Sequence, residues 1–137
     1  MKKLLALGLL LATGFLAGCS GSPDTTEPAQ PAAGTYATIT AQQAKQMMDA
    51  SDGYVILDVR TEAEYQQGHI ANAILIPNTD ITAQAPSAIP DKQTVIFVYC
   101  RSGVRAQDAS QQLAAMGYTH VYDMGGLVNW PYGTVTN

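Results

Sequence analysis

Residues 36–137 are predicted to form an α/β domain, in which helices cover both faces of a parallel sheet. Two observations favour this class. Short apolar segments alternate along the chain with segments that carry helical spacing and helix-capping residues. The segment at 94–99 is almost continuously apolar, which is typical of a parallel strand buried on both faces. Strands that alternate with helices in this way pair in parallel through crossover connections.

The individual elements are predicted from their start and stop signals. Thr40 is a helix N-cap residue, and Thr61 and Glu64 have the spacing of a capping box. Strands are expected at 36–39, 54–58, 73–76, 94–99 and 120–123. Helices are expected from the cap at Thr40 to Ala50, after Thr61, as one turn at 80–85, at 104–116, and as a last turn at 127–130. Pro86 and Pro90 predict a loop after that single turn.

Residues 1–18 are predicted to be a secretory signal peptide and not part of the fold. Lys2 and Lys3 precede an apolar stretch at 4–17, which is short for a membrane span. The sequence Leu-Ala-Gly-Cys that ends at Cys19 resembles the lipobox of bacterial lipoproteins. That resemblance implies that Cys19 is lipidated and becomes the mature N-terminus. The alternative is an ordinary signal peptide in which Cys19 is incidental.

Residues 19–35 are predicted to be the lipidated cysteine followed by a disordered tether. From Ser20 to Thr35 no aliphatic side chain is larger than that of alanine, so this stretch cannot form a core. It would reach roughly 20–25 Å from the bilayer. We therefore expect a protein of the bacterial cell envelope, anchored to the membrane by lipid and facing the periplasm if the cell has two membranes. Residues 36–137 suffice for one domain with one core.

Composition and charge exclude several kinds of partner. Without Lys2 and Lys3 the chain holds five basic and eleven acidic residues, a net charge of −6 with neutral histidines. No basic stripe is present, so nucleic acid is not expected as a partner. His69, His120 and a single mature thiol besides Cys19 are too scattered to predict a metal site, and no cofactor is expected. An intradomain disulfide is not expected either.

Cys100 is the candidate nucleophile. It follows the buried strand at 94–99 and precedes a helix N-terminus, at the sheet edge where ligands bind in open α/β folds. Backbone N–H groups, the helix dipole and two nearby arginines would stabilise a thiolate and attract an anion. The residues expected to bind the substrate are Arg101, Ser102, Gly103, Val104 and Arg105. The alternative is that Cys100 is a small core side chain, which its charged neighbours disfavour.

The remaining charged candidates are expected to be mostly structural. Arg101 is expected to face the mouth of the site, whereas Arg105 either pins the loop or forms an ion pair at the helix start. Asp58 and Arg60 lie at the end of another strand, on the same sheet edge as Cys100, and could form the pocket rim, but charged groups at strand ends usually pair. The same pairing is expected of Glu64.

Three blocks of sequence resemble the rhodanese family of sulfurtransferases. The loop Cys100-x-x-Gly-x-Arg105 resembles the family's active-site loop. Residues 57–77 contain Asp-Val-Arg, Glu-Tyr, Gly-His-Ile and Ile-Pro in the family's order, and 123–130 end in the family's Gly-Gly and Trp. The resemblance covers about residues 38–132 and implies a rhodanese-like five-stranded parallel sheet in the order 1-5-4-2-3. It implies a structural turn at His69. The tail after Trp130 departs from the family's usual ending.

The resemblance also implies a reaction. Sulfane sulfur would pass from thiosulfate or a persulfide donor to a thiophilic acceptor, through a persulfide on Cys100. Cyanide, glutathione and a thioredoxin-like protein all remain possible acceptors. Two alternatives stay open: a non-catalytic module that binds an anion or a partner, and a cysteine-dependent phosphatase. Phosphatases of this kind have five residues between Cys and Arg, whereas four residues separate Cys100 from Arg105.

Overall fold

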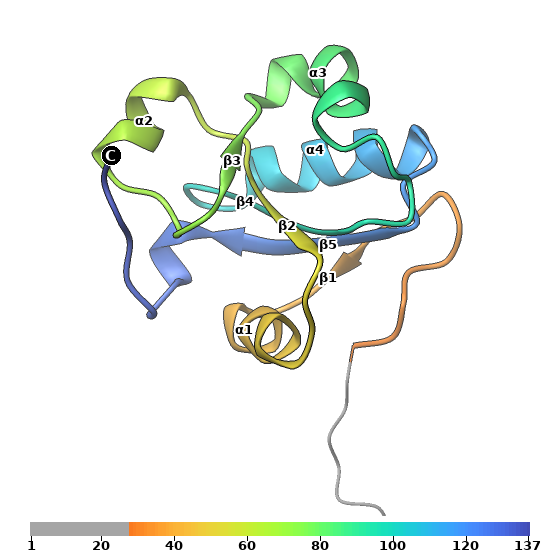
Figure 1. Cartoon of the computed structure of the whole chain (residues 1–137), viewed down its shortest axis with the longest axis horizontal. Helices are drawn as coiled ribbons and strands as arrows, with labels where there is room; N and C mark the ends of the chain where they lie inside the picture. The colour runs from red at the N-terminus through yellow and green to blue at the C-terminus, as the bar shows by residue number, and fades with distance from the viewer. Residues whose placement is uncertain (1–27) are drawn as a thin grey trace, which may run out of the picture.

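The structure, a computed structural model, describes residues 28–137, so the predicted signal peptide and Cys19 lie outside the described residues. Five strands form one parallel sheet in the order β1-β5-β4-β2-β3 (Figure 1), which confirms the predicted topology. The strands are β1 (Ala37–Thr38), β2 (Tyr54–Asp58), β3 (Ile74–Leu75), β4 (Val95–Cys100) and β5 (His120–Gly126).

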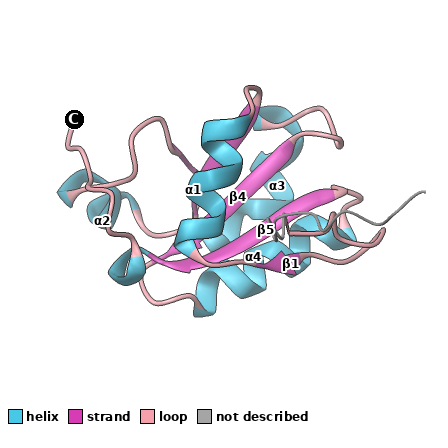
Figure 2. Cartoon of the chain, turned by 90° about the horizontal axis from the view of Figure 1, so that it is seen from below, coloured by secondary structure: helices cyan, strands magenta, loops and turns pink. Residues whose placement is uncertain are grey.

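Helices cover both faces of this sheet. They are α1 (Ala41–Ala50), α2 (Glu62–Gln67), α3 (Ile81–Ala88) and α4 (Val104–Ala115), with 3₁₀ turns η1 (Asn78–Asp80) and η2 (Leu127–Asn129). Helices α3 and α4 lie on one face and α1 on the other (Figures 1 and 2). Both predicted caps are present: Thr40 and Thr61 each accept a hydrogen bond from the backbone of the third helical residue, whose side chain reciprocates.

The sequence of the middle strand β4 does not alternate between apolar and polar residues, because both faces of the strand are covered. Ile96, Val98 and Cys100 pack on the side of α3 and α4, whereas Phe97 and Tyr99 pack with α1 on the other side. Because both faces are covered, every second position no longer needs to be polar. Cys100 therefore ends the strand with its side chain in the α4 layer.

The segment around Pro86 corrects one prediction. The loop expected there is helical, because α3 runs from Ile81 to Ala88 and contains Pro86. Ile81, Ala85 and Ile89 are fully or almost fully buried, and their spacing of four places them on one helical face. Burial of this apolar stripe outweighs the hydrogen bond that the proline ring removes.

The described part of the predicted tether, residues 28–35, lies against the domain. Pro31 is buried, and Pro28 and Gln30 line a cavity together with residues of α1, β4 and β5. The backbone N–H of Thr35 donates to the carbonyl of Ala32 and closes a turn before β1. Within residues 28–137, no helix combines the length and the apolar character needed to cross a bilayer.

The helical setting of Pro86 gives a stability prediction. Pro86→Ala restores a backbone N–H to α3, so we expect the free energy of unfolding to rise by about 1–2 kcal/mol after allowance for the more flexible unfolded chain. Urea denaturation measures this change. Pro90→Ala is the matched control, because Pro90 is exposed and lies beyond the helix; it should give no gain. Equal effects of the two substitutions would contradict the helical assignment.

Candidate active site

Cys100 lies at the base of a tight loop between β4 and α4. Its side chain is 1% exposed, and the backbone N–H of Gly103 donates a hydrogen bond of 3.0 Å to its Sγ atom. A hydrogen bond donated to sulfur stabilises negative charge there, and the N-terminus of α4 adds to this effect. Gly103 has a φ of +113°, a backbone conformation that side-chain-bearing residues rarely adopt. The loop can therefore turn back onto its own sulfur only with glycine at this position.

Gly126 supports the loop from the neighbouring strand. A Cβ atom at this position would lie 2.4 Å from the carbonyl oxygen of Arg101 and 2.7 Å from the Cα of Ser102. The pairing of β4 with β5 shifts register just before Cys100, which pairs with Gly126. Bulges of this kind often re-aim a residue beside an active site. The sequence alone did not predict this role for Gly126, although the Gly-Gly motif at 125–126 was the available signal.

Arg105 is held by Glu64 and not by the loop itself. The two guanidinium ends of Arg105 each donate a 2.8 Å hydrogen bond to a different carboxylate oxygen of Glu64. Glu64 also accepts from the backbone and hydroxyl of Thr61. The bond from Arg105, more than any other contact, holds the pKa of Glu64 far below its usual range, and the same bond raises the pKa of Arg105. This bidentate pair ties the start of α4 to α2.

Asp58 and Arg60 form a buried ion pair, as expected for charges at a strand end. Asp58 is fully buried and accepts hydrogen bonds from the Arg60 guanidinium, at 2.7–3.0 Å, and from the Tyr99 hydroxyl at 2.7 Å. Arg60 also donates to the carbonyl of Gly68 at 2.7 Å, and the Tyr99 hydroxyl accepts from the backbone N–H of Ile70. The network thus joins two strands to the turn after α2.

Burial and charge act in opposite directions within this network. Burial lowers the pKa of Arg60, but the hydrogen bonds and charge of Asp58 outweigh it, so the pKa of Arg60 is raised. Burial also raises the pKa of Tyr99, and its bond to Asp58 adds to that shift. Tyr99 directly precedes Cys100, so the network fixes the end of β4 from the face opposite the thiol.

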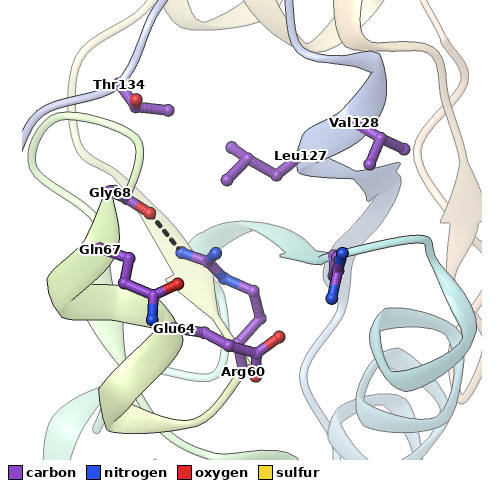
Figure 3. A pocket seen from close by; sticks show the side chains of 8 residues that line it. Arg60, Glu64, Gln67, Gly68, Leu127, Val128 and Thr134 are labelled. Atoms are coloured by element: carbon purple, nitrogen blue, oxygen red, sulfur yellow. Dashed lines mark hydrogen bonds between the residues drawn. The ribbon is translucent and has the colours of Figure 1, made fainter.

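A pocket of about 390 Å³ opens beside the Cys100 loop. It is lined by Arg60, Glu64, Gln67, Gly68, Arg101, Leu127, Val128 and Thr134. Figure 3 shows Gln67, Gly68 and Thr134 along one wall, with Leu127 and Val128 across from them. Arg60 is held against Gly68 by the hydrogen bond drawn there. Arg101 is exposed and lies on the pocket wall, whereas Asp58 is buried behind Arg60 and does not reach it.

The other loop residues contribute mainly backbone. Ser102 and Val104 are exposed, and Val104 keeps 75% of its surface accessible as the first residue of α4. The backbone of Gly103 is engaged at both ends, because its N–H donates to Cys100 and its carbonyl accepts from Gln107.

His69 has the structural setting that the sequence indicated. Its ring is buried, stacks on Tyr65 with ring centres 3.7 Å apart, and bonds through Nδ1 to the Tyr65 carbonyl. His120 is half-buried and contacts the Thr119 hydroxyl. Across the described residues, no group of three or more His, Cys, Asp or Glu side chains could hold a metal ion.

These features define a class of site. A thiol is held in a backbone loop at the carboxyl edge of a parallel sheet, and an arginine without an ion partner among the described residues lies in the adjoining pocket. Such a site suits a small anion beside a sulfur nucleophile.

Comparisons with known proteins agree with this class. The profile of the family described as "Rhodanese-like domain" matches residues 40–131, so the chain belongs to the rhodanese-like family. It is 42% identical over 71 residues to the thiosulfate sulfurtransferase PspE of Escherichia coli, which covers 52% of this chain and 68% of that protein. It is also 34% identical over 97 residues to a tRNA uridine(34) hydroxylase of Yersinia pestis, covering 67% of this chain but only 27% of the hydroxylase.

Solved structures of rhodanese-like proteins have a similar fold. A structure titled as a rhodanese with anions from E. coli has a TM-score of 0.59 and 37% identity, covering 61% of this chain and 99% of that chain. The rhodanese-like domain of a protein from Anabaena has a TM-score of 0.67 and 30% identity, covering 73% and 79%.

The close approach at Gly126 gives a test of the loop geometry. Gly126→Ala places a methyl group against the backbone of Arg101 and Ser102, which cannot move without opening the loop. We expect a loss of about 1–3 kcal/mol in the free energy of unfolding, measured by urea denaturation. Asn129→Ala, an exposed change in the adjacent turn, should alter it by less than about 0.5 kcal/mol. A neutral Gly126→Ala would show that the loop is not held by this contact.

The ion pair between Glu64 and Arg105 gives a pH prediction. Because the pKa of Glu64 is lowered by folding, the unfolded chain binds a proton first as the pH falls below about 4.3. The pair therefore contributes stability above that pH and loses it as the pH falls toward the folded-state value. Glu64→Gln should cost about 1 kcal/mol at neutral pH. It should also flatten the decline in stability between about pH 5 and 3.

Urea denaturation at a series of pH values measures both effects. Glu62→Gln is the control, since Glu62 is exposed on the same helix and has no arginine partner among the described residues. An unchanged slope in Glu64→Gln would contradict the assignment.

Proposed function

We propose that this protein is a sulfurtransferase that carries sulfane sulfur on Cys100, with thiosulfate or a persulfide as the donor. The observation that carries the proposal is the thiol cradled by the N–H of Gly103 at a helix N-terminus, beside a pocket lined by Arg101. The likeness to the thiosulfate sulfurtransferase PspE supports thiosulfate as a donor.

The first step needs no general base, because the attacking group is a thiolate. The Cys100 thiolate attacks the outer sulfur of thiosulfate, a new S–S bond forms, and the S–SO₃ bond breaks as sulfite departs with the electron pair. The persulfide then takes the place of the thiolate in the loop. Arg101 holds the sulfonate oxygens of the donor, while backbone N–H groups of the loop stabilise the charged outer sulfur.

The position of Arg105 argues against phosphatase chemistry. A phosphatase loop needs its arginine to hold the phosphoryl oxygens, whereas both ends of the Arg105 guanidinium are bonded to Glu64. Asp58, the carboxylate on the same sheet edge, is buried and paired with Arg60, so it is not placed as a general acid. A module that only binds anions would not require the thiol.

Persulfide formation tests the proposal. The soluble fragment from Ser20 onward, incubated with thiosulfate, should gain one sulfur atom by intact mass, and a dithiol should remove it. Cys100→Ser should gain none and should show no turnover. An assay with an aryl phosphate runs in parallel. Phosphate release without a persulfide would favour the phosphatase. If neither a persulfide nor free phosphate forms, the result would favour the binding module.

Arg101 is the expected anion contact. Loss of one charge-assisted contact in Arg101→Ala should raise the KM for thiosulfate about 10-fold or more, corresponding to roughly 1.5–3 kcal/mol. Lys45→Ala, which removes a positive charge from α1 outside the pocket, should change that KM by less than twofold. Equal effects of the two variants would mean that Arg101 contributes only to the general field of the protein.

We also propose that the protein is exported and anchored by lipid on Cys19, with residues 1–18 removed and residues 36–137 forming the catalytic domain. The proposal rests on the sequence from Leu16 to Cys19 and on the polar stretch that follows. Cys19→Ala should abolish lipid attachment and move the protein out of the membrane fraction. A variant that stays in that fraction as tightly as the parent protein would show that another feature anchors it.

A further inference from the structure

The pocket beside the Cys100 loop, to which the loop contributes Arg101, is much larger than the sulfur anion proposed to enter it. Its volume of about 390 Å³ lies in the range of sites for organic ligands, which begins near 300 Å³. Thiosulfate and cyanide contain only a few heavy atoms, and both would leave most of this space to water. The remaining space lies along the wall formed by the end of α2 and the C-terminal tail (Figure 3).

The C-terminal tail is fixed on this wall by backbone hydrogen bonds. The N–H of His69 donates to the carbonyl of Val135 at 2.9 Å, and the N–H of Val135 donates back at 2.8 Å. Closer to the start of the tail, the indole N–H of Trp130 donates to the carbonyl of Gly133 at 3.1 Å. Figure 1 shows this segment running up to α2.

These anchors place Thr134 at the pocket. A Cβ atom on Gly68 would lie 3.3 Å from the Thr134 hydroxyl oxygen, so the hydroxyl sits directly against the turn that accepts the Arg60 hydrogen bond. The backbone of this wall is therefore held in place before a ligand binds, which lowers the entropic cost of binding.

The wall offers a particular set of contacts. Thr134 and Gln67 are exposed and line the pocket, and among the described residues neither the Thr134 hydroxyl nor the Gln67 amide has a protein partner. Leu127 and Val128 supply an apolar surface across from them. The charges of Arg60 and Glu64 are paired with Asp58 and Arg105, which leaves Arg101 as an uncompensated positive charge in the lining.

We infer that Thr134 and Gln67, with Arg101, form an outer subsite that selects the sulfur acceptor, a low-molecular-weight peptide thiol with amide groups and a free carboxylate. This inference rests on the proposed sulfur transfer and names its second substrate. Thr134 and Gln67 would hydrogen-bond the amides, Arg101 would pair with the carboxylate, and Leu127 and Val128 would contact the methylene groups.

Sulfur passes to such an acceptor by a second displacement at the outer sulfur. The sulfur of the acceptor thiol attacks the outer sulfur of the Cys100 persulfide, and the S–S bond to Cys100 breaks. The bonding electron pair returns to Sγ as the thiolate, and the proton of the acceptor thiol ends on the new acceptor persulfide. Cyanide can take the same sulfur but has nothing to place in the outer subsite.

Single-turnover kinetics on preloaded protein test this inference. Protein whose persulfide has been verified by mass is mixed with glutathione, 2-mercaptoethanol or cyanide. Thr134→Val and Gln67→Met should each slow the reaction with subsaturating glutathione about threefold to tenfold, as expected for one hydrogen bond. The reactions with 2-mercaptoethanol and cyanide should change less than twofold. The matched controls, Thr136→Val and Gln66→Met, should leave all three unchanged.

Binding of S-methylglutathione separates this inference from the proposed function, because that probe has no thiol to react. Calorimetry should show binding to the parent protein that weakens about threefold to tenfold in Thr134→Val and Gln67→Met. If the persulfide fails to form but this pattern holds, the sulfurtransferase proposal is wrong and the subsite stands. Absence of binding, or equal slowing with all three acceptors, would overturn the subsite.

Discussion

The buried ion pair between Asp58 and Arg60 is the interaction on which the geometry of the pocket depends. It fixes the carboxyl end of β2, receives the Tyr99 hydroxyl from β4, and reaches the turn after α2 through the Gly68 carbonyl. A buried pair of this kind is weak evidence for stability, but removing one partner typically costs about 3–5 kcal/mol. It acts mainly by positioning, because β2, the turn at Gly68 and Tyr99 of β4 all bind to one carboxylate and one guanidinium.

Two contacts hold the Cys100 loop without engaging the thiol or the side chain of Arg101. Gly126 allows the backbone of Arg101 to approach β5, and Glu64 holds Arg105 at the start of α4. With Arg105 engaged, the loop holds the thiol with the N–H of Gly103, while Arg101 lies on the pocket wall. Such a division suits one bound sulfur atom better than a tetrahedral phosphoryl group.

Local sequence patterns predicted most of the fold and the central residue of the candidate site. The helix caps at Thr40 and Thr61, the apolar run of β4 and the Cys100 loop all depend on neighbouring residues, so they could be identified without the structure. Pro86 misled the prediction because the apolar stripe of α3 outweighs a single breaking residue. The pairing of Arg105 was left between two interpretations, since its partner Glu64 lies 41 residues away.

The tail wall could not be predicted in the same way. Val135 reaches His69 through backbone hydrogen bonds, which any residue type could form, so the sequence of the tail carries no signal for this contact. For Gly126 the Gly-Gly motif was a signal, but its role depends on a register shift between two strands that the sequence does not show. Long-range backbone geometry decides both features.

We propose that the loop holds sulfur on Cys100 while Arg105 remains bound to Glu64. A crystal structure of the thiosulfate-treated protein would show whether both hold at once. The expected result is density for one additional sulfur atom bonded to Sγ, within hydrogen-bond distance of loop N–H groups, with the ion pair intact. An oxyanion bound to Arg105, with Glu64 displaced and no sulfur added to Cys100, would contradict it.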